Sequence, residues 1–60
     1  MAIRAIIRAR YNLDRGEWVA YEFDPNSVRA PVNTCSGRSE RSALRNASIY
    51  IKKYGSSFLA

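Results

Sequence analysis

The side chains that could do chemistry in this sequence are mainly cationic. Ten lysine and arginine residues stand against five acidic residues in a chain of 60, and histidine does not occur. Histidine is the commonest general base and a frequent metal ligand, and the five acids show no spacing typical of a paired-carboxylate active site. We therefore expect a protein that is not an enzyme, with no catalytic residues, no metal, no cofactor and no small-molecule substrate.

The single cysteine, Cys35, does not change this expectation. A nucleophilic cysteine needs a base and an orienting group, which the sequence does not identify, so we interpret Cys35 as a packing residue of a strand. One cysteine cannot form an internal disulfide, which favours a cytoplasmic location. Arg4 and Arg8 interrupt the first apolar residues, and no apolar run approaches the roughly 18–20 residues of a membrane span, so we expect neither secretion nor membrane insertion.

The positive charge is concentrated in the second half of the chain. Four arginines and four acids cancel in residues 1–24, whereas residues 25–60 hold six cationic residues against Glu40 alone. The formal net charge of +5 therefore falls entirely after residue 24. This asymmetry favours an anionic partner, either nucleic acid or an acidic protein surface.

One group of candidate contact residues lies near the amino terminus. Arg4, Arg8 and Arg10 alternate along a predicted strand, so they share one face of the sheet, and we expect Trp18 beside them. Guanidinium groups next to an indole are typical of a platform that contacts phosphates and stacks on bases. The alternative is a solvated face on which the arginines cover Trp18 and pair with the glutamates of the second strand.

The other candidates are a basic row on the predicted helix and the tryptophan itself. The helical row consists of Arg41, Arg45 and Lys52, for which the alternative is again a solvated face without a ligand. Trp18 is the large residue that we predict to leave the core face, and an exposed tryptophan is a favoured anchor in protein interfaces. Trp18 is therefore the candidate protein-contact residue.

A β-hairpin would position the first group. Residues 2–11 and 17–24 alternate between their two faces, and residues 12–16 contain turn formers that end in Gly16. We predict that these two strands pack their apolar residues on one common face. The residues expected there are Ile3, Ala5, Ile7, Ala9 and Tyr11 of the first strand and Val19, Tyr21 and Phe23 of the second.

A turn and a short third strand are expected next. Residues 24–27 read DPNS, a strong turn sequence. Residues 32–35 alternate after Pro31, whose missing N–H group suits an edge strand.

The helix that carries the second basic row is expected over residues 39–54. Ser39 is its predicted N-cap and Gly55 its predicted terminator. For the tail, residues 55–60, the sequence leaves open whether Phe58 folds back onto the domain. The apolar stripe that we expect to cover the sheet consists of Ala43, Leu44, Ala47, Tyr50, Ile51 and Tyr54.

These elements predict one α+β domain over residues 1–60. Its sheet is small and antiparallel, with two strands plus a short third, and one C-terminal helix packs on it in the order ββ(β)α. A domain of this size buries only about 60% of the surface of its unfolded chain, so its core is marginal. With an edge strand next to Pro31 and Trp18 outside the core, we expect a second copy to cover this surface in a homodimer.

Two segments resemble the amino-terminal domain of HicB-like antitoxins. Residues 14–24 read DRGEWVAYEFD and residues 37–51 read GRSERSALRNASIYI. The first is similar to the family's strand-pair pattern D-x-G-x-[YW]-V-A, and the second to its helix-opening pattern G-x-[ST]-x-x-x-A-L-x-N-A. The matching positions are Asp14, Gly16, Trp18, Val19 and Ala20, followed by Gly37, Ser39, Ala43, Leu44, Asn46 and Ala47.

The resemblance covers roughly residues 3–54 and implies the same sheet-and-helix fold. Members of the family neutralise a small ribonuclease toxin or occur as isolated domains, and many carry a separate DNA-binding domain. A toxin with an RNA-binding surface would be basic, whereas this chain has a net charge of +5. We therefore expect a stand-alone accessory protein of a phage or mobile element rather than a toxin-neutralising one.

The expected function is that of a small regulatory or accessory protein that acts through protein contacts. Its partner is another protein, which the sequence does not identify, or a second copy of the chain. The alternative is an RNA- or DNA-binding module that uses the basic sheet and helix faces.

Overall fold

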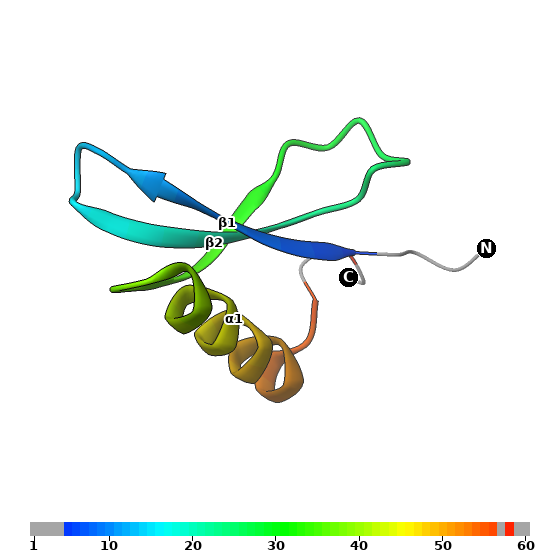
Figure 1. Ribbon diagram of the computed structural model, residues 1–60. Coiled ribbons are helices and arrows are strands. Elements are labelled where there is room, and N and C mark those ends of the chain that lie inside the picture. The colour runs from blue at the N-terminus through cyan, green and yellow to red at the C-terminus, as the bar shows by residue number, and fades with distance from the viewer. Residues whose placement is uncertain (1–4, 57, 59–60) are drawn as a thin grey trace.

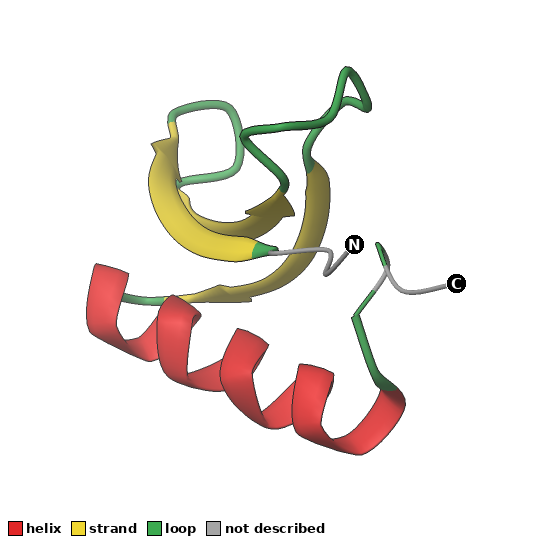
Figure 2. Ribbon diagram, turned by 90° about the vertical axis from the view of Figure 1, so that its right-hand side faces the viewer, coloured by secondary structure: helices red, strands yellow, loops and turns green. Residues whose placement is uncertain are grey.

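The computed structural model describes residues 5–56 and 58, and it has one sheet and one helix (Figure 1). The strands are β1 (Ile6–Asn12), β2 (Glu17–Phe23) and β3 (Val32–Gly37), and they pair antiparallel in the order β1-β2-β3. The helix α1 (Glu40–Tyr54) lies across one face of the sheet (Figure 2). The predicted α+β fold is confirmed, and the third strand is two residues longer than expected.

The two predicted turns form as expected. In the hairpin loop, the Asn12 side-chain oxygen accepts hydrogen bonds from the backbone N–H groups of Asp14 (3.0 Å) and Arg15 (3.2 Å). Gly16 closes the loop in a left-handed conformation, with φ of 65° and a 2.8 Å bond from its N–H to the Asn12 carbonyl. This loop fixes the pairing of Asn12 with Glu17, and therefore the register of the whole hairpin.

That register overturns the predicted face assignment of β2. Ile7 pairs with Glu22, Ala9 with Ala20 and Tyr11 with Trp18, and directly paired residues lie on the same face of a sheet. The face that meets the helix therefore carries Ile7, Ala9, Trp18, Ala20 and Glu22. The prediction that Val19, Tyr21 and Phe23 pack on the Ile7 face was wrong, because these residues lie on the opposite face with Arg8 and Arg10. Ile3 and Arg4 lie outside the described residues.

The wrong assignment has a physical reason. β2 reads EWVAYEF and is largely apolar on both faces, so alternation alone does not choose between them. Glu22 led to the wrong assignment, because a glutamate is rarely buried unless it is paired and its face was therefore predicted to be exposed. Here its side chain is only 1% exposed and accepts a hydrogen bond from the Ser56 hydroxyl.

The core between sheet and helix is built from small residues. Ala20 of β2 and Ala43 and Ala47 of α1 are fully buried and in contact. Around them pack the half-buried side chains of Ile7, Ala9, Trp18 and Cys35. Alanine side chains allow a helix backbone to approach a sheet closely, which leaves no room for large rings between the two layers.

Two residues of the predicted helix stripe do not cover the sheet. Tyr50 and Tyr54 are exposed, whereas Leu44 and Ile51 are half-buried as part of the stripe. The helix axis is inclined to the sheet, and its carboxyl end lies farther from the strands than its amino end (Figures 1 and 2). The stripe therefore meets the sheet along its first half and leaves it toward Tyr54.

Both predicted helix ends are confirmed. The Ser39 hydroxyl accepts a 3.1 Å hydrogen bond from the Ser42 N–H, as an N-cap does. At the other end Gly55 has a φ of 88°, and its N–H donates to the Ile51 carbonyl at 2.7 Å. Lys52 and Lys53 lie in the last turn, where positive charge is favourable.

Phe58 folds back onto the domain, which answers the question that the sequence left open. Phe58 is buried, and its N–H donates to the Ser56 hydroxyl oxygen at 3.1 Å. The Arg29 guanidinium lies 4.5 Å from the centre of the Phe58 ring. Together with the bond from Ser56 to Glu22, these contacts fasten residues after the helix to the sheet and to the loop before β3.

None of the helical segments in the described part of the chain combines the length and the apolar composition of a membrane span.

The junction between β3 and α1 is the tightest point of the fold. A Cβ atom on Gly37 would lie 2.6 Å from the Ala43 backbone nitrogen and 2.9 Å from the Ser42 carbonyl carbon. Three residues later in the helix, the Asn46 side-chain amide donates to the Ser36 carbonyl at 2.9 Å. The helix is thus held against β3 by a close backbone approach and a side-chain hydrogen bond.

We predict that Gly37→Ala lowers the free energy of unfolding by about 1–3 kcal/mol, because backbone atoms have to move to admit the methyl group. Urea denaturation followed by circular dichroism measures this. Arg38→Ala, an exposed neighbour, is the control and should stay within about 0.5 kcal/mol of the parent. A Gly37→Ala variant as stable as the parent would mean that the helix does not lie this close.

Candidate interaction surfaces

The first candidate surface is the face of the sheet that points away from the helix, here called the outer sheet face. Arg8 and Arg10 of β1 are exposed on it, as predicted. Arg8 pairs directly with Tyr21, and Arg10 pairs with Val19. The outer sheet face consists of Ile6, Arg8, Arg10, Asn12, Glu17, Val19, Tyr21, Phe23, Asn33 and Ser36.

Arginine and aromatic side chains touch one another on this face. The Arg10 guanidinium lies 5.3 Å from the centre of the Tyr21 ring, within the range of a cation–π contact. The Tyr21 and Phe23 rings follow each other with centres 5.9 Å apart and planes tilted by 32°. Both rings are half-buried, so part of each remains open to solvent.

A shallow hollow adjoins these rings where β2 and β3 run side by side. Val19 is one of its lining residues and is buried, although the helix lies on the other face. The polar residues Asn33, Thr34 and Ser36 of β3 line one side. The pairing of β2 with β3 shifts register between Ala20 and Tyr21, an irregularity of the bulge type that locally disrupts the ladder.

An ion pair borders the hollow. The Arg15 side-chain nitrogen lies 3.1 Å from a Glu17 carboxylate oxygen, and both residues line the hollow. The predicted alternative had the sheet arginines paired with the glutamates of the second strand. Glu17 instead pairs with Arg15, and Glu22 lies on the helix side of the sheet, so the charges of Arg8 and Arg10 give the outer sheet face a positive character.

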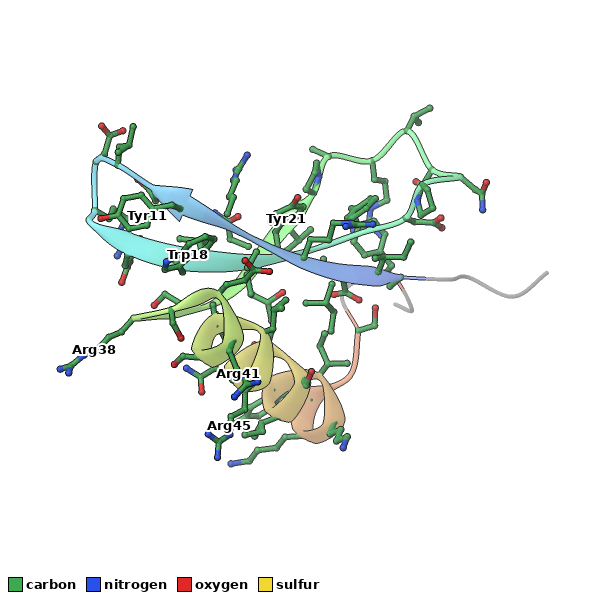
Figure 3. All side chains as sticks on the ribbon, in the orientation of Figure 1. Tyr11, Trp18, Tyr21, Arg38, Arg41 and Arg45 are labelled. Atoms are coloured by element: carbon green, nitrogen blue, oxygen red, sulfur yellow. The ribbon has the colours of Figure 1, made fainter. Side chains whose placement is uncertain are left out.

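The second candidate surface lies at the hairpin, on the helix side of the sheet. The Tyr11 and Trp18 rings make an edge-to-face contact with centres 5.8 Å apart (Figure 3). Tyr11 is 49% exposed, and Leu13 in the following loop is 86% exposed. We call Tyr11, Leu13 and Trp18 the hairpin patch.

The predicted location of Trp18 was wrong. Trp18 does not leave the core face, and it does not stand beside Arg8 and Arg10. It is half-buried against the alanine core, opposite Gly37 of β3. Its neighbours Tyr11 and Leu13 are exposed.

The third candidate surface is the basic row of the helix. Arg41, Arg45 and Lys52 are exposed, and Arg41 and Arg45 point away from the sheet (Figure 3). The Tyr50 and Tyr54 rings are in contact, with centres 4.7 Å apart and planes tilted by 45°, but helical geometry places them on the other side of the helix. The basic row therefore has no aromatic partner among the described residues of its own side.

The structure brings some of the predicted site residues together and separates others. Arg8 and Arg10 share a face, whereas the helical row lies on the opposite side of the molecule, and Arg4 lies outside the described residues. Sequence reasoning missed Tyr21 and Phe23 as surface residues. The signal that could have found them is the hairpin loop, because pairing Asn12 with Glu17 places Tyr21 across from Arg8.

Comparison of the chain with models of protein families, with curated proteins and with solved structures found no match.

We predict that Trp18→Ala lowers the free energy of unfolding by about 3 kcal/mol, because truncation of a half-buried ring that packs against the core leaves a cavity. Leu13→Ala, which removes an apolar side chain from solvent, should stay within about 0.5 kcal/mol of the parent. Denaturation followed by circular dichroism compares the two variants without using tryptophan fluorescence. Equal stability of both variants would show that Trp18 is not part of the core.

Proposed function

We propose that this chain is a non-enzymatic, HicB-like regulatory or accessory module that binds a protein partner through the hairpin patch. The observation that carries the proposal is the exposure of large apolar side chains there, with Leu13 at 86% and Tyr11 at 49%. Tyrosine beside a partly buried tryptophan is a combination enriched at interface anchors. The hairpin presents these side chains on a short loop braced by three hydrogen bonds to Asn12.

The charges near the hairpin patch favour a protein partner over a polyanion. Around the loop and the start of the helix, three cationic residues are balanced by three acids: Arg15, Arg38 and Arg41 against Asp14, Glu17 and Glu40. Because there is no excess charge here, the exposed apolar side chains are the feature of this surface that a partner can bind. Its partner would present an apolar surface with a mixed polar rim.

The HicB-like character of the module is supported by the roles of the matched residues. Gly37 allows the close approach of the helix, Ser39 caps it and Asn46 ties it to β3. The matched alanines Ala43 and Ala47 form the core with the sheet. These roles support a shared fold, and on that basis we propose an accessory protein of a phage or mobile element. A lone, half-buried cysteine is consistent with action in the cytoplasm.

A second copy of the chain is one partner that this proposal includes. β1 and β3 are the edge strands of the sheet. If β1 paired antiparallel with the β1 strand of a second copy at full overlap, Arg8 of one copy would lie opposite Arg10 of the other. Such a pairing of like charges is unfavourable. We therefore place self-association at the hairpin patch rather than at the β1 edge.

The alternative function, binding of RNA or DNA, has separate support. The outer sheet face combines Arg8 and Arg10 with Tyr21, whose ring already holds the Arg10 guanidinium at 5.3 Å. The helical row offers charge alone. Of the two basic surfaces, the sheet is the better supported site for nucleic acid.

We predict that Leu13→Asp weakens binding of the protein partner at least tenfold, because a charge replaces an apolar contact at the centre of the patch. Sedimentation over a range of concentrations tests the second copy as partner. For another protein, affinity capture from the source cells provides candidates, and calorimetry with the purified pair measures the dissociation constant.

Arg45→Gln on the far side of the helix is the matched surface control and should leave this binding unchanged. The proposal is contradicted if Leu13→Asp binds as tightly as the parent, or if Arg45→Gln weakens binding as much.

A further inference from the structure

We propose that the outer sheet face binds single-stranded nucleic acid, with bases stacked on Tyr21 and Phe23 and phosphates bound by Arg8 and Arg10. This inference rests on the alternative function given above and makes it specific. It is independent of the hairpin patch, which lies on the other face of the sheet.

The rings supply the stacking surface. Tyr21 and Phe23 lie two residues apart on β2, so both point to the outer face, with ring centres 5.9 Å apart. Aromatic side chains on an open sheet stack two or three bases of a single strand in known recognition modules. Stacking does not depend on base identity, so this arrangement predicts broad sequence tolerance.

The arginines supply contacts to the phosphate backbone. Arg8 lies directly across from Tyr21, and Arg10 lies next along the same strand face. Without ligand, the Arg10 guanidinium covers the Tyr21 ring at 5.3 Å. A base can take this place on the ring while the long Arg10 side chain turns to a phosphate, or the base can stack on the guanidinium plane itself.

The hollow supplies polar groups next to the rings. Asn33 pairs with Tyr21 across the β2–β3 ladder and lines the hollow together with Ser36. Their amide and hydroxyl groups are exposed and can hydrogen-bond the edge of a base that lies over Val19. A duplex keeps its bases stacked and paired, so it offers neither ring faces to Tyr21 nor free edges to Asn33.

Charge distinguishes nucleic acid from a second copy of the chain on this face. Two outer sheet faces packed against each other would bring Arg8 and Arg10 of both copies together, which is unfavourable. A polyanion gains from the same arginines through the release of its counterions. The occupant that fits the charge of this face is therefore a nucleic-acid strand.

Fluorescence anisotropy tests the proposal with labelled, mixed-sequence RNA and DNA strands of about 12 nucleotides and the matching duplexes, at about 50 mM salt and above. The parent should bind the single strands more tightly than the duplexes. Tyr21→Leu should weaken binding about tenfold, the effect of one lost base stack. Changing Arg8 and Arg10 to Gln should lower the slope of log affinity against log salt by about 0.7 for each arginine.

Two controls separate this site from the others. Arg45→Gln combined with Lys52→Gln removes the same charge from the helix and should weaken binding less than the sheet pair does. Leu13→Asp should leave nucleic-acid affinity unchanged, so failure of the protein-binding proposal and failure of this one are distinguishable. Circular dichroism establishes that each variant is folded, and the exposed arginines keep the test valid if Tyr21→Leu unfolds.

Several results would overturn the proposal. They are the absence of binding at about 50 mM salt, equal binding of duplexes, and a helical double variant that weakens binding as much as the sheet pair. Self-association of the parent that is lost in Tyr21→Leu would also overturn it, because a second copy would then occupy the outer sheet face.

Discussion

At Gly37 the backbone of β3 passes so close to the first turn of α1 that a Cβ atom would lie 2.6 Å from the Ala43 nitrogen. The same close approach continues along the interface, where Ala20, Ala43 and Ala47 are fully buried against one another. Buried alanines contribute little hydrophobic free energy each, since stabilisation scales with apolar area. The interface between sheet and helix is therefore stabilised by close backbone packing and by the Asn46 hydrogen bond to Ser36, rather than by burial of large side chains.

The close packing of helix against sheet determines where the aromatic residues lie. Large rings do not fit between the sheet and the alanines of the helix, so Tyr21 and Phe23 lie on the outer sheet face. Tyr50 and Tyr54 are exposed where the helix leaves the sheet. Trp18 packs beside the alanine core rather than within it. The resulting molecule has two distinct surfaces, an apolar one at the hairpin and an arginine-rich aromatic one on the sheet. The two proposed partners correspond to this division.

Much of the fold could be predicted from local signals, whereas the face assignment could not. Turns and helix ends depend on contacts within a few residues, so the residue types at these positions indicate the structure directly. The examples are Asn12 with Gly16, the turn at Asp24, the N-cap Ser39 and the terminator Gly55. The faces of β2 depend on the register of the hairpin, and a shift of one residue exchanges them.

The amino-acid composition of β2 indicated the wrong face as the one that packs on the helix. Val19, Tyr21 and Phe23 of β2 lie on the outer sheet face, whereas the helix side includes Glu22, whose partner Ser56 lies 34 positions away in the sequence. The candidate site was predicted in part for the same reason. The shared face of Arg8 and Arg10 can be predicted from alternation along one strand. The identity of their aromatic neighbour depends on the pairing between two strands. Sequence reasoning placed Trp18 beside them, and the structure places Tyr21 there.

Nuclear Overhauser effects between assigned side chains in solution test this arrangement most directly, because they report which face of β2 meets the helix. The structure predicts contacts from the Ala20 methyl group to the methyl groups of Ala43 and Ala47. It predicts none from the Tyr21 or Phe23 rings to those alanines. Contacts between the Tyr21 ring and Ala43 or Ala47, with Ala20 remote from the helix, would show that the opposite face packs on α1 and would contradict this account of both surfaces.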